Sequence, residues 1–178
     1  GSLFPLGGQN SAFAVSALDR KVMWENLKWN EKPLKGLLRC GPSGADFVTY
    51  QSRQDLCVAD PLTGNIRWKR NDLDLNDGLF SNQMFGIIGD RNCITLFRSD
   101  GVRYRIFDTY DGREIRAGQL GASQPYLRLT CGRCLLYASY DGNQQPVLRL
   151  WDPLNDKVLF ESPIHPQFSQ LYSMCDGG

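Results

Sequence analysis

The residues best suited to hold a metal ion lie in one short acidic stretch. Residues 71–78 carry, besides Asn71, four closely spaced oxygen-bearing side chains, Asp72, Asp74, Asn76 and Asp77. The first three fit the opening of an EF-hand calcium loop, in which the sixth residue is glycine and the twelfth is glutamate. Counted from Asp72, these two positions hold Asp77 and Gln83. We therefore interpret the stretch as a polar loop, with Asp72, Asp74 and Asp77 as weak metal candidates.

A second pattern with chemical potential is Cys131-Gly-Arg-Cys134. Its spacing suits half of a zinc site or a redox pair. A zinc site needs a second pair of ligands, and the only histidine is His165, between Ile164 and Pro166. A redox motif of the thioredoxin type opens a helix, whereas this one separates strand-like segments. The pattern favours a tight turn, with a local disulfide or a metal or redox site as alternatives.

Other catalytic chemistry finds little support in the composition. One histidine in a loop does not assemble a Ser/His/Asp or Cys/His site, and no phosphate-cradling GxxxxGK[ST] pattern occurs. We predict no catalytic residue and no cofactor. The net charge of +1 gives no reason to expect nucleic acid as a partner. No apolar run approaches the roughly 20 residues that span a bilayer, so no membrane insertion is predicted for this segment.

The elements that would position any site come from an internal repeat. Four segments align on Asp19, Asp60, Asp108 and Asp152, with spacings of 41, 48 and 44 residues. A four-stranded propeller blade is about 40–50 residues long. The spacing therefore predicts one blade for each aspartate.

The residues after each aspartate predict a turn. In Asp60-Pro-Leu-Thr-Gly64, the Asp carboxylate can accept hydrogen bonds from backbone N–H groups, and Thr63 and Gly64 close the turn. Asp108 with Gly112 repeats this chemistry, and Asp152 begins a third such turn. A large side chain follows eight residues after the aspartate in these copies, at Trp68, Arg116 and Phe160. In the first copy, Trp24 follows Asp19 after five residues, which predicts a shorter turn.

Alternating apolar residues predict strands between the turns, most clearly at Val102, Tyr104 and Ile106. We therefore expect an all-β, β-propeller-like fold of about four blades, each a four-stranded antiparallel sheet, forming a segment of a larger ring or a small closed ring. Residues 1–2 have the character of an expression scar, and residues 3–178 are expected to form a single domain. The expected repeats are 3–35, 36–80, 81–122 and 123–165, followed by a strand at 168–174.

The segment from Val58 to Trp68 resembles the repeat of quinoprotein-like propellers, a family related to pyrroloquinoline-quinone alcohol dehydrogenases. That repeat reads roughly Ala-x-Asp-x-x-Thr-Gly-x-x-x-Trp. In the family the tryptophan docks one blade onto its neighbour, so the resemblance implies docking by Trp24, Trp68 and, by position, Phe160. The stretch from Trp68 to Gly112 also resembles large multi-repeat bacterial proteins. Residues 148–152 resemble a WD-repeat strand instead, which is the second choice.

The resemblance does not carry the quinone chemistry with it. Such an enzyme needs calcium ligands, a catalytic aspartate and usually two adjacent cysteines, and no cysteines are adjacent here. We expect a non-catalytic module that acts as a protein-interaction or scaffolding surface. The alternative is a propeller that binds or converts a carbohydrate, a metal or a quinone.

We also expect open blade edges. Unpaired strand edges favour association with another chain. The blades could form an arc of a larger ring, close on themselves, or pair with a second copy, so self-association is one predicted property. The cysteines leave the compartment open, although the resemblance leans towards an extracytoplasmic one.

Overall fold

The computed structural model describes residues 3–7, 12–16, 18–33, 38–52, 55–73, 87–98, 100–121 and 127–164. Within these residues the secondary structure consists of short strands and turns. The strands are β1 (Leu3–Gly7), β2 (Ala12–Ser16), β3 (Val22–Glu25), β4 (Lys28–Trp29), β5 (Lys32–Pro33), β6 (Leu38–Ser43), β7 (Val48–Ser52), β8 (Asp55–Ala59), β9 (Ile66–Arg70), β10 (Ile87–Gly89), β11 (Cys93–Phe97), β12 (Arg103–Asp108), β13 (Glu114–Gln119), β14 (Leu127–Cys131), β15 (Cys134–Tyr140), β16 (Pro146–Asp152) and β17 (Lys157–Pro163).

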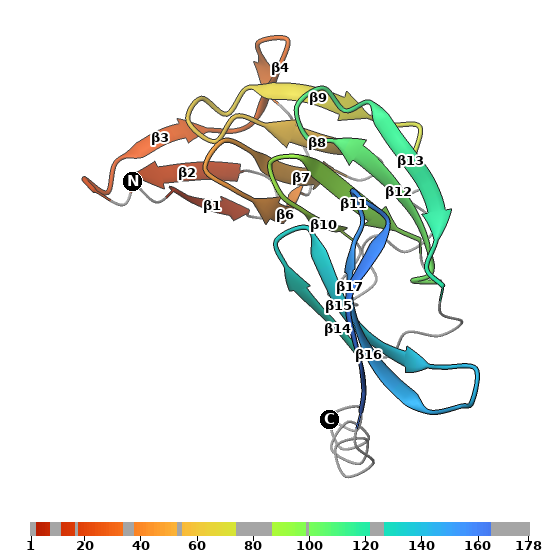
Figure 1. The fold of residues 1–178 in the computed structure, drawn as a ribbon. Coiled ribbons are helices and arrows are strands. Elements are labelled where there is room, and N and C mark those ends of the chain that lie inside the picture. Colours follow the sequence, from red (N-terminus) through yellow and green to blue (C-terminus); the bar gives the residue numbers. More distant parts are fainter. Residues whose placement is uncertain are drawn as a thin grey trace.

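The strands form four successive antiparallel sheets, which we call blades. Blade 1 is β1–β2–β3, blade 2 is β6–β7–β8–β9, blade 3 is β10–β11–β12–β13 and blade 4 is β14–β15–β16–β17. A two-stranded hairpin, β4–β5, lies between blades 1 and 2. Figure 1 shows the blades following one another along an open arc. The expected all-β fold of four-stranded antiparallel sheets is confirmed, and the described residues do not close into a small ring. Among them, no helix is long and apolar enough to cross a membrane.

The turn between the last two strands of each blade, which we call the outer turn, has the predicted chemistry. The Oδ1 atom of Asp60 accepts hydrogen bonds from the backbone N–H groups of Leu62 and Thr63, at 2.8 and 3.1 Å. Asp108 Oδ1 does the same for the N–H groups two and three residues further on. The N–H of Gly64 closes the turn on the carbonyl of Asp60. Each aspartate therefore fixes the outer turn at its first position.

In blade 1 the outer turn begins at Ser16, three residues earlier than the sequence alignment placed it. The N–H of Arg20 donates to the carbonyl of Ser16, and the N–H of Ser16 donates to the carbonyl of Lys21. The same two hydrogen bonds close the turn at Asp60 and at Asp108. Asp19 therefore holds the fourth position, where its carboxylate accepts from the N–H of Lys21 at 3.4 Å.

This register makes the four repeats equal in one respect. From Ser16, Asp60, Asp108 and Asp152, the large side chain follows after eight residues every time, at Trp24, Trp68, Arg116 and Phe160. The expected shorter turn of the first copy does not occur. The alignment of the first copy on Asp19 gave the wrong register, because a serine can begin a turn through its side-chain oxygen as an aspartate does.

The tryptophan at the eighth position joins each of the first two blades to the next. Trp24 Nε1 donates to the carbonyl of Pro61 at 2.8 Å, in the outer turn of blade 2. Trp68 Nε1 donates to the carbonyl of Thr109 at 2.9 Å, in the outer turn of blade 3. A Cβ added to Gly112 would lie 2.6 Å from the Trp68 ring. The glycine that ends the turn is therefore the surface on which the indole rests.

Between blades 3 and 4 an ion pair takes over this position. Arg116 replaces the tryptophan and Asp156 replaces the glycine, with a backbone φ of 50°. Arg116 Nη1 lies 3.0 Å from Asp156 Oδ2. The Tyr104 hydroxyl and the Trp151 indole N–H each donate to Asp156 Oδ1 at 3.2 Å. The two residues at this boundary are complementary in charge, and the register of docking is kept.

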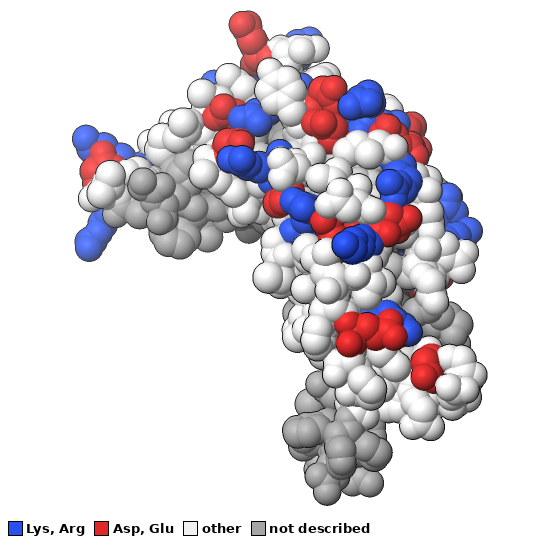
Figure 2. Space-filling view, viewed as in Figure 1, with Lys and Arg blue, Asp and Glu red and all other residues white. Residues whose placement is uncertain are grey.

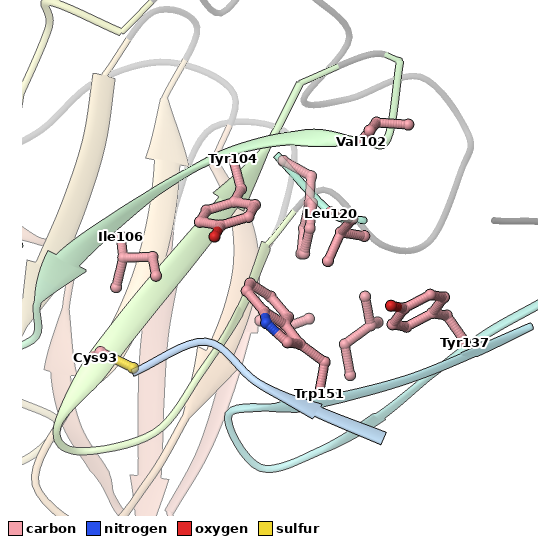
Figure 3. Packing of buried hydrophobic residues seen from close by; sticks show 10 residues of the cluster. Cys93, Val102, Tyr104, Ile106, Leu120, Tyr137 and Trp151 are labelled. Atoms are coloured by element: carbon pink, nitrogen blue, oxygen red, sulfur yellow. The ribbon is translucent and has the colours of Figure 1, made fainter. Parts of the chain in front are cut away.

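Three apolar cores lie between the blades. Blades 1 and 2 enclose Trp24 and Tyr50, and blades 2 and 3 enclose Trp68 and Phe107. The core between blades 3 and 4 is the most aromatic, and Figure 3 shows Tyr104 beside Trp151, with ring centroids 4.7 Å apart. Each blade thus buries apolar side chains on both faces when it has a neighbour on both sides.

Substitution of Gly112 tests the docking of Trp68. Gly112→Ala places a methyl group against the indole and forces alanine to a φ of 74°, so we expect the free energy of unfolding to fall by about 2–4 kcal/mol. Urea-induced unfolding followed by tryptophan fluorescence measures this.

Two other glycines separate the effect of the indole contact from the effect of the positive φ. Gly132 also has a positive φ, of 60°, but nothing lies within 4 Å of an added Cβ, so Gly132→Ala should cost only about 1 kcal/mol. Gly142 has open space and no positive φ, so Gly142→Ala should stay within about 0.5 kcal/mol of the parent. Equal losses at Gly112 and Gly132 would show that the indole contact does not matter.

Blades 2 and 3 each bury a threonine whose hydroxyl has no partner among the described residues. Thr49 and Thr95 lie on the second strand of their blades, and their Oγ1 atoms make no hydrogen bond. A buried hydroxyl without a partner costs roughly 1–3 kcal/mol. The two threonines are therefore weak points of the inter-blade packing.

Removal of one such hydroxyl should strengthen the fold. We expect Thr95→Val to raise the free energy of unfolding by about 1 kcal/mol, because valine keeps the shape and loses the unpaired oxygen. The matched control is Thr109→Val, which removes a hydrogen bond of 2.8 Å from Thr109 Oγ1 to the carbonyl of Asp90 and should lower stability by about 1 kcal/mol. A loss of stability in Thr95→Val would refute the interpretation.

Candidate functional site

The carboxylate of Asp72, the first metal candidate, is held by arginines. Arg70 Nε and Nη2 donate to its two oxygens at 2.8 and 2.5 Å, and Arg105 Nη2 lies 3.5 Å away. The hydrogen bond from Arg70 is the main reason that the pKa of Asp72 falls to about 2. Both guanidinium groups also lie over the Phe107 ring, 4.9 and 5.2 Å from its centroid. Asp72 therefore joins blades 2 and 3 electrostatically.

Asp74 and Asp77 lie outside the described residues, as do His165 and the expected strand at 168–174. Within the described ranges no three His, Cys, Asp or Glu side chains gather where they could hold a metal ion.

Cys131 and Cys134 flank a tight turn, as the favoured interpretation predicted. They are paired across β14 and β15, with Gly132 and Arg133 between them, and both thiols are free. Cys93 is buried beside this turn, and burial raises the pKa of its thiol to about 12. A thiol with such a pKa is a poor nucleophile at neutral pH.

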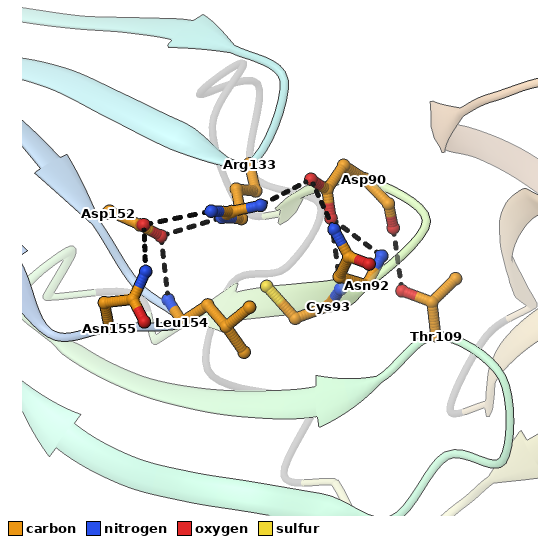
Figure 4. Close-up of polar contacts among 8 residues, drawn as sticks. All are labelled: Asp90, Asn92, Cys93, Thr109, Arg133, Asp152, Leu154 and Asn155. Carbon is orange, nitrogen blue, oxygen red and sulfur yellow. Dashed lines mark hydrogen bonds and ion pairs between the residues drawn. The ribbon is translucent and has the colours of Figure 1, made fainter.

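Arg133, which no sequence pattern singled out, links two blades through its guanidinium group. It projects from the tight turn of blade 4 and bridges two blades, as Figure 4 shows. Its Nε and Nη2 atoms donate to the two oxygens of Asp152 at 2.8 and 3.0 Å, and Nη1 donates to Asp90 in blade 3 at 3.1 Å. Asp152 also accepts hydrogen bonds from Leu154 N and Asn155 Nδ2 within its own outer turn.

These contacts make Asp152 a structural carboxylate. The hydrogen bonds from Arg133 are the main cause that lowers the pKa of Asp152 to about 2, and the side chain is only 4% exposed. The pKa of Arg133 is raised for the same reason. Every oxygen of Asp152 is thus engaged, which leaves no lone carboxylate for proton transfer at this position.

The side chain of the third residue of the outer turn is exposed in blades 1 to 3, whereas that of Leu154 in blade 4 is half-buried. In blades 1 to 3 it is Leu18, Leu62 and Tyr110, whose exposed fractions are 86%, 58% and 77%. The first, fourth and fifth positions make the turn, so the third side chain is free to project into solvent. Antiparallel pairing puts the outer turns on the same rim as the turns between the first two strands, and the contact of Thr109 Oγ1 with Asp90 joins two such turns in blade 3. We call this edge the turn rim.

The alignment of the first copy on Asp19 hid that Leu18, Leu62 and Tyr110 hold equivalent positions. The signal was present, because all three stand two residues after the start of an outer turn once blade 1 is aligned on Ser16. Charged side chains of both signs are interspersed on the face shown in Figure 2. No large area of one sign appears there among the described residues, in keeping with the net charge of +1.

Comparison with known proteins identifies the fold. No family model matches the chain, and no curated protein matches it by sequence. BamB from Moraxella catarrhalis superimposes with a TM-score of 0.51 at 19% identity, over 92% of this chain and 47% of that chain. The Kuenenia stuttgartiensis hydrazine synthase gives a TM-score of 0.53 at 15% identity, over 93% and 47%.

Both matched structures contain β-propellers. The present chain has a β-propeller fold, and the expected likeness to quinoprotein-like propellers is confirmed at the level of the fold. The chain spans about half the length of each of these two relatives.

The ion pair of Asp152 with Arg133 should make the protein sensitive to acid. Because the pKa of Asp152 falls from 3.8 to about 2 on folding, its contribution to stability is present above pH 4 and is lost as the pH falls towards 2. This contribution is roughly 2 kcal/mol. We expect Asp152→Asn to lower the free energy of unfolding by about that amount at pH 7 and to reduce its slope between pH 4 and 2, as measured by urea unfolding at each pH.

Arginine substitutions supply the controls. Arg133→Gln removes the same ion pair and should destabilise to a similar extent. Arg113→Gln alters an arginine that is 73% exposed and 3.9 Å from Asp111, so it should change stability by less than about 0.5 kcal/mol. If the free energy of unfolding of Asp152→Asn changes between pH 4 and 2 as much as that of the parent, other carboxyl groups cause the acid sensitivity.

Proposed function

We propose that this chain is a non-catalytic propeller module that binds a protein partner through its turn rim. The observation that carries the proposal is the recurrence of a large exposed apolar side chain at the third position of three successive outer turns, Leu18, Leu62 and Tyr110. Scattered exposed apolar residues are ordinary on protein surfaces. A repeated one, at a position that the fold leaves free, supports a surface used for contact.

The chemistry of these side chains suits a protein partner. Aromatic residues are enriched at the centres of protein interfaces, where they bury a large area at low entropic cost. Exposed charges near the rim, such as Arg113 and Asp111, would supply the polar surround. A rigid series of turns carrying variable side chains is a common way for propellers to present a binding surface.

The state of the carboxylates supports a non-catalytic role. The oxygens of Asp60 and Asp108 accept hydrogen bonds within their turns, and Asp152 is paired with Arg133. Asp72, the described member of the metal candidates, is paired with two arginines. A metal- or quinone-dependent activity at these residues would first have to break interactions that hold the blades together.

The test is the effect of rim substitutions on binding. The double variant Leu62→Ser/Tyr110→Ser should keep its melting temperature, because both side chains are exposed. It should capture at least about tenfold less of the proteins that the parent chain retains from an extract of the producing organism, as quantified by mass spectrometry. Two substitutions are enough for such an effect, because a few residues contribute most of the binding free energy at most protein interfaces.

The matched control is Tyr140→Ser. Tyr140 is similarly exposed but ends β15 on the edge of blade 4 opposite the outer turns. Its variant should retain the same proteins as the parent. Identical capture by all three chains would contradict a binding role of the turn rim.

A further inference from the structure

Blade 4 presents a row of four apolar side chains on one face. The strand register pairs Leu129 with Leu136, Leu136 with Leu150, and Leu150 with Phe160. Directly opposed residues of antiparallel strands project from the same face of a sheet. The row therefore crosses all four strands of blade 4 and ends at Phe160, the eighth-position residue. We call the face that bears this position the trailing face of a blade.

The corresponding row is buried in the blades that have a successor. In blade 2 it contains Val58 and Trp68, and in blade 3 it contains Ile88 and Ile106. Those four side chains are at most 6% exposed, because the next blade covers them. In blade 4, Leu129 is 51% and Phe160 49% exposed. Phe160 thus has the position of a docking residue, and no blade of the described residues follows it to dock on.

The face of a blade opposite its trailing face is called the leading face. In blade 1 no preceding blade of the described residues covers this leading face. Ala59, Phe107 and Trp151 directly precede the turn aspartates of blades 2, 3 and 4, and each is buried against the preceding blade. The equivalent of these residues in blade 1 is Val15, which is only half-buried. Its partner across the strands, Val22, is 51% exposed.

We propose that a second copy of this chain seats the leading face of its blade 1 on the trailing face of blade 4. The two surfaces are of the kinds that meet three times within the chain, so the contact would continue an interface that the fold already uses. Arg20, with a φ of 58°, would lie at the turn position that Gly64 and Gly112 hold in the internal contacts. Phe160 has no N–H to donate, so it would contribute apolar packing alone.

This head-to-tail contact is heterologous, and such contacts form a ring when the rotation closes. One copy spans 47% of each matched propeller chain, so two copies supply about the length of one of them. The inference does not rest on the turn rim, because it uses the two ends of the arc of blades.

Analytical ultracentrifugation from about 1 to 300 μM tests the proposal. We expect a reversible monomer–dimer equilibrium for the parent chain. Phe160→Lys should raise the dimer dissociation constant at least about a hundredfold, because it would bury a positive charge beside Arg20 of the second copy. Leu129→Glu, at the far end of the row, should act in the same direction. Circular dichroism and the melting temperature show whether each variant is folded.

Val22→Glu determines the direction of the contact. In a head-to-tail dimer it should weaken association as much as Phe160→Lys, although it lies at the other end of the chain. Tyr140→Glu and the rim variant Leu62→Ser/Tyr110→Ser should dimerise like the parent. A parent chain that is monomeric at every concentration overturns the proposal, and so does a dimer that survives Val22→Glu or both trailing-face substitutions. Neither result bears on partner capture by the turn rim.

Discussion

One contact repeats along this protein, and the other features of the blades are arranged around it. A side chain eight residues beyond the start of an outer turn leaves its own blade and rests on the fifth residue of the next blade's outer turn. The contact needs a backbone with positive φ at that fifth residue, and a large side chain to reach it. Trp24 on Gly64 and Trp68 on Gly112 meet both needs, with an indole N–H that also satisfies a turn carbonyl. Stacking of one blade on the next then buries the apolar rows between them.

The third contact shows how far the chemistry can change while the geometry stays. Arg116 and Asp156 replace tryptophan and glycine, and Trp151 now supplies the indole from the facing blade. Arg133 adds a second ion pair across the same boundary. The ion pair of Arg133 with the buried Asp152 is lost in acid, whereas an indole on a glycine is indifferent to pH. The boundary between blades 3 and 4 therefore depends on the ionisation of Asp152, as the boundary between blades 2 and 3 depends on that of Asp72.

This division of labour also explains which residues are free for function. The first, fourth and fifth positions of the outer turn are needed for the turn and the docking, so their side chains are committed to structure. The third position is not, and there the chain carries Leu18, Leu62 and Tyr110. The repeated aspartates look like an array of catalytic carboxylates only until their hydrogen bonds are traced. The outward faces of the first and last blades are the other uncommitted surfaces, and they are apolar because they are built like internal ones.

The sequence by itself determined the repeat, the strand-and-turn alternation and the chemistry of the outer turn at Asp60 and Asp108, because these depend on residues close together in the chain. It misaligned the first copy, since Ser16 and Asp19 are both plausible turn residues and only the backbone hydrogen bonds distinguish them. It gave no sign of Arg133, nor of the pairing of Arg116 with Asp156, because their partners lie some twenty to forty residues away and meet only when blades stack. Whether Phe160 docks or stays exposed was likewise decided by the tertiary structure, because docking requires a neighbouring blade and not a particular residue.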